Sequence, residues 1–303
     1  MPTLSIFILC HNRPVETRQA IRSVLNQRDP DYTLTISDNS SNDEVQRLVQ
    51  AEFPSLRYVR RQPMLPSLEH FNRCIDEAQG DYFCLFHDDD LMRPDFVGEM
   101  KKAAQSHPRA VAVGCNAVVE VFGTPQAATF FRSFRRIEVI TSARDLAVRY
   151  FARSQSGIAP FPGYIYNKTL VGTLRLPPGG GKYADATWLI NLVRQGPIVW
   201  INQPLITYRM HAGNDGNIES RRDRLRTLAY LKRNISWLGR GILQDYRCSF
   251  VYKTIRRSSD KSPPARLRVA TAFLNRYRWM RYTRLDTYKA LLQRALAKWL
   301  PEQ

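Results

Sequence analysis

The sequence predicts an α/β fold in which helices flank a Rossmann-like, mostly parallel sheet. Short apolar runs typical of buried strands alternate along the chain with segments whose apolar residues repeat every three to four positions. The spacing between successive apolar runs leaves room for the crossover helix that parallel strands require. The 303 residues, of which 44% are hydrophobic, are also enough to bury a substantial core.

The alternation is clearest in residues 1–90. LSIFIL (4–9) has the pattern of a buried strand, and Pro14 can occupy the first turn of a helix that ends near Gln27. The next predicted strands are YTLTIS (32–37), RYVR (57–60) and DYFCLF (81–86), with predicted helices at 44–52 and 67–78. Strands and helices that alternate in this way imply a parallel sheet with crossover connections.

The second half of the chain is less regular. We predict a strand at 110–122, a helix at 142–154, a glycine-rich loop at 177–188 that leads to a helix at 189–195, and a strand continuing into an extended segment at 197–211. Beyond Asn217 the apolar periodicity predicts helices with a break at 261–264. We therefore expect one domain over 1–217, with halves 1–110 and 111–217, and a helical region over 218–303.

The positive charge of the chain is concentrated in that last region. Residues 220–303 contain 21 Lys and Arg and 5 Asp and Glu, whereas residues 1–219 contain 24 and 22. A nearly neutral body thus precedes a strongly basic segment, which suggests two separate roles.

The composition also indicates in which cellular compartment the protein is found. No run reaches the roughly 18 to 20 apolar residues of a transmembrane helix, and the N-terminus lacks the basic leader and cleavage site of a signal peptide. The five cysteines are odd in number and form no C-x-x-C pair, which favours free thiols over disulfides or a zinc site. We expect a cytoplasmic protein that does not span a membrane.

Polar clusters follow three of the predicted strands, at residues 10–13, 38–43 and 87–90. Ligands bind at the carboxyl ends of the strands in parallel sheets, so these clusters are expected to line one edge. Asp88, Asp89 and Asp90 are the most informative group. They are either a solvated turn with a helix cap or, because they directly follow a buried strand, the oxygen ligands of Mg²⁺ or Mn²⁺.

The motifs LSIFILCHNRP, TISDNSSND and GDYFCLFHDDDLMRPDF together resemble the family 2 glycosyltransferases of GT-A fold, and the similarity covers residues 3–100. KYADATWLINLVRQGPIVWINQPLITYRMH extends it to residue 211. The resemblance implies transfer of a sugar from a nucleotide diphosphate to an acceptor hydroxyl.

The resemblance also implies how the donor would be bound. Leu9, His11 and Arg13 would approach the nucleotide, with Arg13 near the diphosphate. Asp38 would accept a hydrogen bond from the imide N–H of uracil or thymine, as in UDP or dTDP donors. An Asx turn after the strand is an equally good reading of Asp38 from the residues alone.

In the acidic motif, His87 occupies the first Asp position of many family members. The preferred assignment gives Asp88 to the ribose, Asp89 to the metal, and Asp90 to a further ligand or a helix cap.

In the later segment, the resemblance assigns Asp185 as the general base that takes the acceptor's proton, although Ala184 replaces its usual acidic neighbour. A helix N-cap is the alternative for Asp185. Arg209 would stabilise the leaving diphosphate, and His211 would complete the metal shell unless it is a structural histidine; Asn214 belongs to the same closing segment.

The basic segment has three readings. Its interleaved aromatic residues suit nucleic acid or an anionic membrane surface, and its apolar stripes could instead pack on the body. With the family resemblance, membrane docking at the inner membrane face is favoured and nucleic acid is disfavoured. We expect an inverting, metal-dependent glycosyltransferase acting on a glycan or lipid-linked glycan in bacterial polysaccharide or lipopolysaccharide synthesis. The alternatives are a nucleic-acid-binding protein and a non-catalytic carbohydrate-binding protein.

Overall fold

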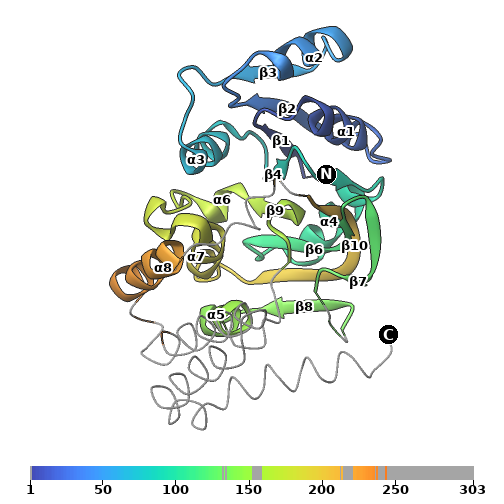
Figure 1. Cartoon of the computed structure of the whole chain (residues 1–303). Helices are drawn as coiled ribbons and strands as arrows, with labels where there is room; N and C mark the ends of the chain where they lie inside the picture. The colour runs from blue at the N-terminus through green and yellow to red at the C-terminus, as the bar shows by residue number, and fades with distance from the viewer. Residues whose placement is uncertain are drawn as a thin grey trace, which may run out of the picture.

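The computed structural model describes residues 2–131, 133, 135–151, 159–211, 213, 221–235, 237 and 243. The described residues form one large mixed sheet covered by helices on both faces (Figure 1). The strands are β1 (Leu4–Cys10), β2 (Tyr32–Asp38), β3 (Arg57–Arg60), β4 (Tyr82–His87), β5 (Leu91–Met92), β6 (Ala112–Val121), β7 (Thr124–Thr129), β8 (Ile137–Ile140), β9 (Tyr164–Asn167) and β10 (Ile198–Met210).

The α-helices are α1 (Pro14–Leu25), α2 (Glu44–Glu52), α3 (Ser67–Glu77), α4 (Phe96–Ser106), α5 (Ala143–Phe151), α6 (Lys168–Val171), α7 (Ala184–Leu192) and α8 (Arg221–Asn234). Two 3₁₀ turns, η1 (Phe161–Gly163) and η2 (Pro178–Tyr183), precede β9 and α7. None of the described helices is long and apolar enough to cross a membrane.

The strand order is β3-β2-β1-β4-β9-β6-β10-β5, with β7 paired to β6 and β8 to β10. The first four strands are parallel, and β6 is parallel to β10. Between these two parallel groups lies β9, which is antiparallel to both β4 and β6. The prediction of a mostly parallel sheet is therefore confirmed. The antiparallel strand β9 was not predicted, because its four residues are too few to show a period.

Alternate residues of the central strands face two different cores. Ile6, Ile8 and Phe86 face one core, which contains the apolar sides of α1, α2 and α4. Phe7 and Leu85 face the other, which contains residues of α3, α5, α7 and α8. Because strand side chains alternate in direction, a run that is apolar at nearly every position is what a strand buried on both faces requires.

The predicted elements of the first half are confirmed, but α4 was not predicted. In the second half, α7 begins at Ala184, five positions before the predicted start at Leu189. The predicted strand at 110–122 and helix at 142–154 appear as β6 and α5; positions 152–154 lie outside the described residues. The predicted break at 261–264 and the helix beyond it also lie outside them.

The first helix of the predicted basic region packs on the body. Leu231 and Ile235 are 1% exposed and belong to the core that contains α7. The hydroxyl of Thr227 donates a hydrogen bond to the carbonyl of Gly180 in η2, at 3.2 Å. One of the three interpretations of the basic region, packing on the body, is therefore observed for α8. The domain boundary at residue 217 stays a prediction.

Candidate active site

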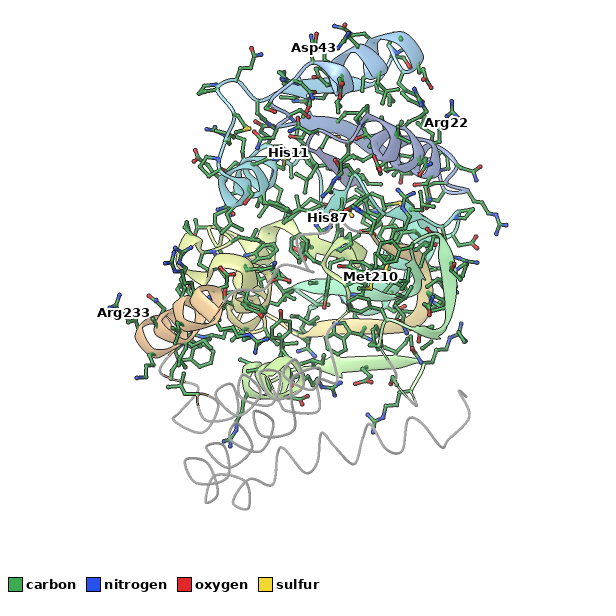
Figure 2. All side chains as sticks on the ribbon, in the orientation of Figure 1. His11, Arg22, Asp43, His87, Met210 and Arg233 are labelled. Atoms are coloured by element: carbon green, nitrogen blue, oxygen red, sulfur yellow. The ribbon has the colours of Figure 1, made fainter. Side chains whose placement is uncertain are left out.

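Three polar loops meet at the carboxyl ends of β1, β2 and β4. In the sheet register Cys10 is opposite Asp38, and Leu9 is opposite His87, so the three strands end at the same level. The polar residues that follow them are thereby brought together, as predicted from the parallel arrangement. Figure 2 labels His11 and His87 among the side chains of this region.

The three consecutive carboxylates are buried at this edge. Asp88, Asp89 and Asp90 are 2%, 6% and 1% exposed. They are followed by β5, and the next helix has Asp95 at its N-cap. The readings of this motif as a solvated turn and of Asp90 as a helix cap are therefore wrong.

Asp88 joins β4 to the loop after β1. Its carboxylate accepts the backbone N–H of His11 at 2.8 Å and contacts Nη1 of Arg13 at 3.2 Å. Burial raises the pKa of Asp88 to about 7; the Asp89 charge adds to the rise, and the His11 N–H and Arg13 oppose it. An anion buried to this degree requires nearby cations.

Asp89 lies between two basic side chains. Its Oδ2 atom is 2.8 Å from Nη1 of Arg13 and 3.1 Å from Nε2 of His211. Arg13 also donates from Nη2 to the carbonyl of Gly213 at 2.8 Å. The Asp89 carboxylate thus joins the loop after β1 to the residues that follow β10. Asn214, also predicted to belong to this closing segment, lies outside the described residues.

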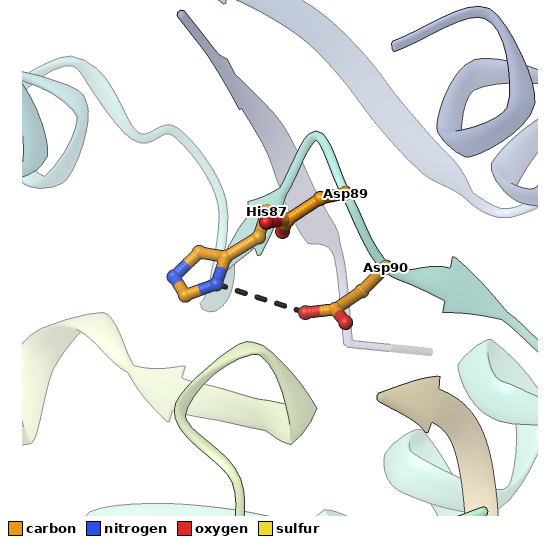
Figure 3. Close-up of side chains that lie close together, drawn as sticks. All are labelled: His87, Asp89 and Asp90. Atoms are coloured by element: carbon orange, nitrogen blue, oxygen red, sulfur yellow. Dashed lines mark ion pairs between the residues drawn. The ribbon is translucent and has the colours of Figure 1, made fainter. Parts of the chain in front are cut away.

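Asp90 is held by β10 and faces a histidine. The backbone N–H of Arg209 donates to Oδ1 of Asp90 at 2.9 Å, and Nδ1 of His87 lies 3.6 Å from Oδ2 (Figure 3). The Nε atom of Arg209 also donates to the carbonyl of Asp89. Burial, and then the charge of Asp89, raise the pKa of Asp90 well above its usual range.

His87, Asp89 and Asp90 have the geometry of a candidate metal centre. One potential ligand atom from each lies within 4.8 Å of the others. Among the described residues, Oδ2 of Asp90 is buried without a hydrogen-bond partner. Two carboxylates and an imidazole suit a divalent ion such as Mn²⁺, so the residues fit the expected metal. This cluster adds His87 to the predicted Asp89 and Asp90, and a place in the metal shell for His211, 3.1 Å from Asp89, stays a prediction.

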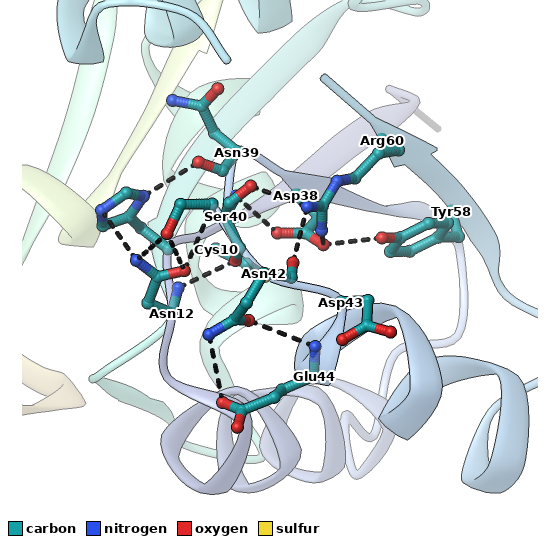
Figure 4. Close-up of polar contacts among 12 residues, drawn as sticks. Cys10, Asn12, Asp38, Asn39, Ser40, Asn42, Asp43, Glu44, Tyr58 and Arg60 are labelled. Atoms are coloured by element: carbon teal, nitrogen blue, oxygen red, sulfur yellow. Dashed lines mark hydrogen bonds and ion pairs between the residues drawn. The ribbon is translucent and has the colours of Figure 1, made fainter. Parts of the chain in front are cut away.

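Asp38 is completely buried and already well supplied with donors. Its Oδ1 accepts the backbone N–H of Ser40 at 2.9 Å, which is the Asx turn left open by the sequence. Its Oδ2 accepts the hydroxyl of Tyr58 at 2.6 Å and Nη1 of Arg60 at 2.5 Å (Figure 4). Arg60 in turn donates to the carbonyls of Ser40 and Asn42. The carboxylate therefore organises the loop after β2, and its contact with a nucleobase stays a prediction.

Two further donor-site predictions differ in their placement. His11 lies at the junction of the β1 and β2 loops, where its Nδ1 is 2.9 Å from the carbonyl oxygen of Asn39. The side chain of Leu9 is 7% exposed and belongs to the core with Phe7 and Leu85. The side chain of Leu9 therefore belongs to the apolar core beneath the polar loops and is not part of their exposed surface.

Asp185 lies in the first turn of α7, where Tyr183 is the N-cap residue, so the N-cap reading is wrong. The residue is partly exposed, but its Oδ1 atom is buried and has no hydrogen-bond partner among the described residues. Burial raises the pKa of Asp185 to about 6. A carboxylate with a raised pKa and an uncommitted oxygen is suited to accept a proton near neutral pH.

Tyr208 lies within the electrostatic influence of both Asp185 and the acidic cluster and was not predicted. Burial raises the pKa of its phenol, and the carboxylates of Asp90, Asp89 and Asp185 raise it further, so all three act on one side chain. Its position two residues before the end of β10 gave no motif that could have revealed this. His87 could have been found, because it directly precedes the three carboxylates.

A family model matches the part of the chain that contains the three polar loops. Residues 5–152 match the family model described as Glycosyl transferase family 2. The family resemblance is confirmed. The matched segment contains the Asp88–Asp90 carboxylates, Arg13 and Asp38, whereas Asp185 and Arg209 lie beyond it.

Two curated relatives are similar to part of this chain. A GalNAc(5)-diNAcBac-PP-undecaprenol beta-1,3-glucosyltransferase of Campylobacter jejuni is 30% identical over 112 residues, which are 35% of this chain and 36% of the relative. An uncharacterized protein of Mycobacterium tuberculosis, MT1568, is 26% identical over 94 residues, 31% of this chain and 30% of the relative. The chain thus spans about a third of the length of each relative.

Solved structures confirm the GT-A fold expected of the family 2 segment and its continuation. Staphylococcus aureus TarS 1-349 in complex with UDP-GlcNAc has a TM-score of 0.60 at 12% identity, covering 99% of this chain and 82% of that one. The mannosyltransferase PcManGT from Pyrobaculum calidifontis, in complex with GDP-Man and Mn²⁺, has a TM-score of 0.51 at 15% identity, covering 98% and 87%. At these identities the likeness concerns the fold alone.

Proposed function

We propose that the protein is an inverting glycosyltransferase that transfers a sugar from a nucleotide-diphosphate donor to a hydroxyl of its acceptor. The observation that carries the proposal is the buried cluster of Asp88, Asp89 and Asp90 with Arg13 at the carboxyl ends of the parallel strands. A polyanionic ligand with its counter-ion suits this mixture of carboxylates and guanidinium groups. The family match over the same residues supports it.

The donor is assigned to the loops after β1, β2 and β4. Asp88 would bind the ribose, and Leu9, His11 and Asp38 would form the nucleotide side of the pocket. Because Asp38 already accepts three hydrogen bonds, we assign much of its contribution to holding Tyr58 and Arg60 in place. A uridine or thymidine diphosphate donor is favoured, and the UDP-GlcNAc complex of TarS supports the uridine form.

The diphosphate is assigned to the cationic side of the cluster. Asp89 and Asp90, with His87, would hold Mn²⁺ or Mg²⁺, which when bound would supply positive charge to the diphosphate. The PcManGT complex with Mn²⁺ supports manganese. Arg13 and Arg209 would stabilise the leaving diphosphate, and His211, 3.1 Å from Asp89, would complete the metal shell.

The acceptor reaction is assigned to Asp185. Its raised pKa suits a general base that removes the proton of the acceptor hydroxyl as that oxygen attacks the anomeric carbon. The bond to the nucleotide diphosphate breaks on the opposite face of the sugar, so direct displacement inverts the anomeric centre. No covalent intermediate with the protein is required.

The acceptor class and location are proposals of the same kind. The Campylobacter relative carries an undecaprenol diphosphate glycan in its name, which supports a lipid-linked glycan acceptor in bacterial polysaccharide or lipopolysaccharide synthesis. We assign the protein to the cytoplasmic face of the inner membrane, with the basic region 218–303 contributing to membrane attachment.

A thermal-shift screen of nucleotide sugars with and without Mn²⁺ tests the proposal. One nucleotide diphosphate should stabilise the protein much more strongly in the presence of the metal. Asp89→Asn should abolish the metal-dependent part, while Asp43→Asn, at an exposed acid paired with Arg47, should not. If no nucleotide shifts the unfolding temperature, the transferase assignment is wrong.

A further inference from the structure

Three half-buried rings lie beside the candidate metal centre. The ring centroid of His87 is 6.0 Å from that of Phe71 and 5.7 Å from that of Phe161, and the two phenylalanine rings are 5.6 Å apart. Each of the three residues is only half-buried, and the side chain of His87 is 30% exposed. We call these three rings the aromatic wall. Because part of each ring stays accessible, the wall can contact a bound molecule.

Phe161 is presented by a rigid turn, η1. Pro160 and Pro162 flank it in the sequence, and a proline ring fixes the φ angle of its own residue. Gly163, at the end of η1, lies so close to β6 that a Cβ atom there would be 3.1 Å from Sγ of Cys115. Both prolines and Gly163 are buried, so Phe161 is the one member of this stretch that stays half-buried. A ring held in this way loses little conformational entropy when a ligand binds to it.

The aromatic wall leads from the candidate metal centre towards the helix of the candidate base. At one end, Nδ1 of His87 is 3.6 Å from Oδ2 of Asp90. At the other end, the ring of Phe161 is 6.5 Å from that of Trp188, which follows Asp185 by one turn of α7. A sugar in transfer must lie between the diphosphate at the metal and the base that activates the acceptor. The wall therefore lies beside the path that such a sugar would occupy.

Buried polar atoms at both ends of the wall lack a protein partner. Among the described residues, Oδ2 of Asp90, Oδ1 of Asp185 and Nε1 of Trp188 are buried without a hydrogen bond. Asp90 has been assigned to the metal, but the two atoms on α7 have no such explanation. Buried polar atoms of this kind are usually completed by water or by a bound molecule. A ligand rich in hydroxyl groups, either directly or through water, can supply both the donor and the acceptor that they need.

We propose that Phe161, together with Phe71, binds the donor's sugar through its C–H face and selects a neutral pyranose. The C–H groups on one face of a pyranose carry slight positive charge, which suits the negative face of an aromatic ring. The carboxylates of Asp90 and Asp185, at the two ends of the wall, would repel the carboxylate of a uronic acid. The inference rests on the proposed function, because that function places the sugar between the metal centre and Asp185.

Phe161→Leu separates contact with the sugar from contact with the nucleotide. Calorimetry of the full chain with Mn²⁺ compares UDP with UDP-glucose, UDP-N-acetylglucosamine and UDP-glucuronate, and dTDP with dTDP-glucose. The variant should bind the preferred neutral sugar nucleotide about tenfold more weakly than the wild type, the effect of losing one aromatic face, and the diphosphate equally well. Phe161→Tyr keeps the ring and should bind both like the wild type. Phe53→Leu, at a half-buried phenylalanine packed on the other core, is the matched control and should change neither affinity.

Phe71→Leu is the second variant, on α3 rather than in the rigid turn, and it should show the same selective loss even if Phe161→Leu does not fold. Equal weakening of the diphosphate and the sugar nucleotide would mean that the rings only support the fold of the site, and would overturn the proposal. Unchanged affinity of both variants for every sugar nucleotide would also overturn it. Tighter binding of UDP-glucuronate than of the neutral sugar nucleotides by the wild type would overturn the choice of a neutral pyranose.

The same titrations distinguish failure of this inference from failure of the proposed function. A wild type that binds no diphosphate and no sugar nucleotide would reject the transferase assignment, and the sugar contact with it. A wild type that binds both, with the ratio of the two affinities unchanged in Phe161→Leu and Phe71→Leu, would leave the transferase assignment in place and reject only the role of the aromatic wall.

Discussion

Arg13, in the loop after β1, and His211, directly after β10, contact the same carboxylate oxygen of Asp89. The distances are 2.8 Å and 3.1 Å. A cation that binds this oxygen must share it with Arg13 or displace it, so the guanidinium and a metal ion compete at Asp89 Oδ2.

Replacing Arg13 should therefore separate metal binding from diphosphate binding. We expect Arg13→Gln to bind Mn²⁺ about tenfold more tightly in the absence of nucleotide, because the competing charge is gone, and to bind the nucleotide diphosphate more weakly. Electron paramagnetic resonance of free Mn²⁺ measures the first effect and calorimetry the second. Arg18→Gln, which removes an exposed partner of Glu52, is the control. Equal Mn²⁺ affinity in Arg13→Gln and the wild type would show that the two cations do not compete.

The pH dependence of turnover should report Asp185. A general base works only when deprotonated, so kcat is expected to rise with pH through an apparent pKa of about 6 and then level off. Asp185→Asn should lower kcat by roughly a hundredfold or more while donor affinity stays unchanged. A variant that keeps the rising limb and the rate would exclude Asp185 as the base.

The same carboxylate should make folding stability depend on pH. Its folded pKa of about 6 lies above the ordinary value of 3.8, so its contribution is fully present below pH 4 and is lost as the pH rises through 6. Asp185→Asn removes this dependence. We expect the unfolding temperature of the variant, relative to the wild type, to be higher at pH 7 than at pH 4. An equal difference at both pH values would contradict the raised pKa.

The Asp38 network should matter for stability as well as for binding. Asp38→Asn leaves Arg60, whose side chain is 16% exposed, without its anionic partner. We expect a loss of about 2 kcal/mol in the free energy of unfolding, measured by urea denaturation, together with weaker nucleotide binding. Asp43→Asn breaks a pair in which both side chains are more than 60% exposed, and it should change stability by less than about 0.5 kcal/mol.

Gly114 is required by close packing in β6. A Cβ atom at this position would lie 2.6 Å from the ring of Tyr164, whose hydroxyl accepts a hydrogen bond from Trp200. Gly114→Ala should therefore destabilise the protein by about 1–3 kcal/mol. Gly98→Ala in α4 is the matched control, because its Cβ would meet only Asp29 at 3.8 Å and alanine is the better helix former. Similar unfolding temperatures for the two variants would contradict this account.

The sequence was most informative where structure depends on local periodicity. The strands β1, β2 and β4 and the helices α1 and α3 could be predicted because each has one continuous apolar pattern bounded by polar residues. The seam strand β9 could not, because four residues carry no usable period and its antiparallel pairing depends on β4 and β6, which are distant in the sequence.

The site shows the same division between local and distant information. The burial of Asp88, Asp89 and Asp90 could be inferred because they directly follow a core strand. The proximity of His87 to Asp90, three residues apart, could likewise have been inferred from the sequence. The shared influence of three carboxylates on Tyr208 depends on the path of β10 and is not encoded in residue spacing.

The topology also implies an order of assembly during synthesis. All the pairings among β1, β2, β3 and β4 lie within the first 87 residues, whereas Ala112 in β6 finds its parallel partner only at Ile198 in β10. Because distant pairings form slowly, we expect the N-terminal strands to associate while the remainder of the chain is still leaving the ribosome. Pulsed hydrogen exchange should then show protection of β1 before β10, and simultaneous protection would exclude this order. The loops after β1, β2 and β4 would thus be brought together before Asp185 is translated, and the contacts of Asp89 and Asp90 with Arg209 and His211 would form only later.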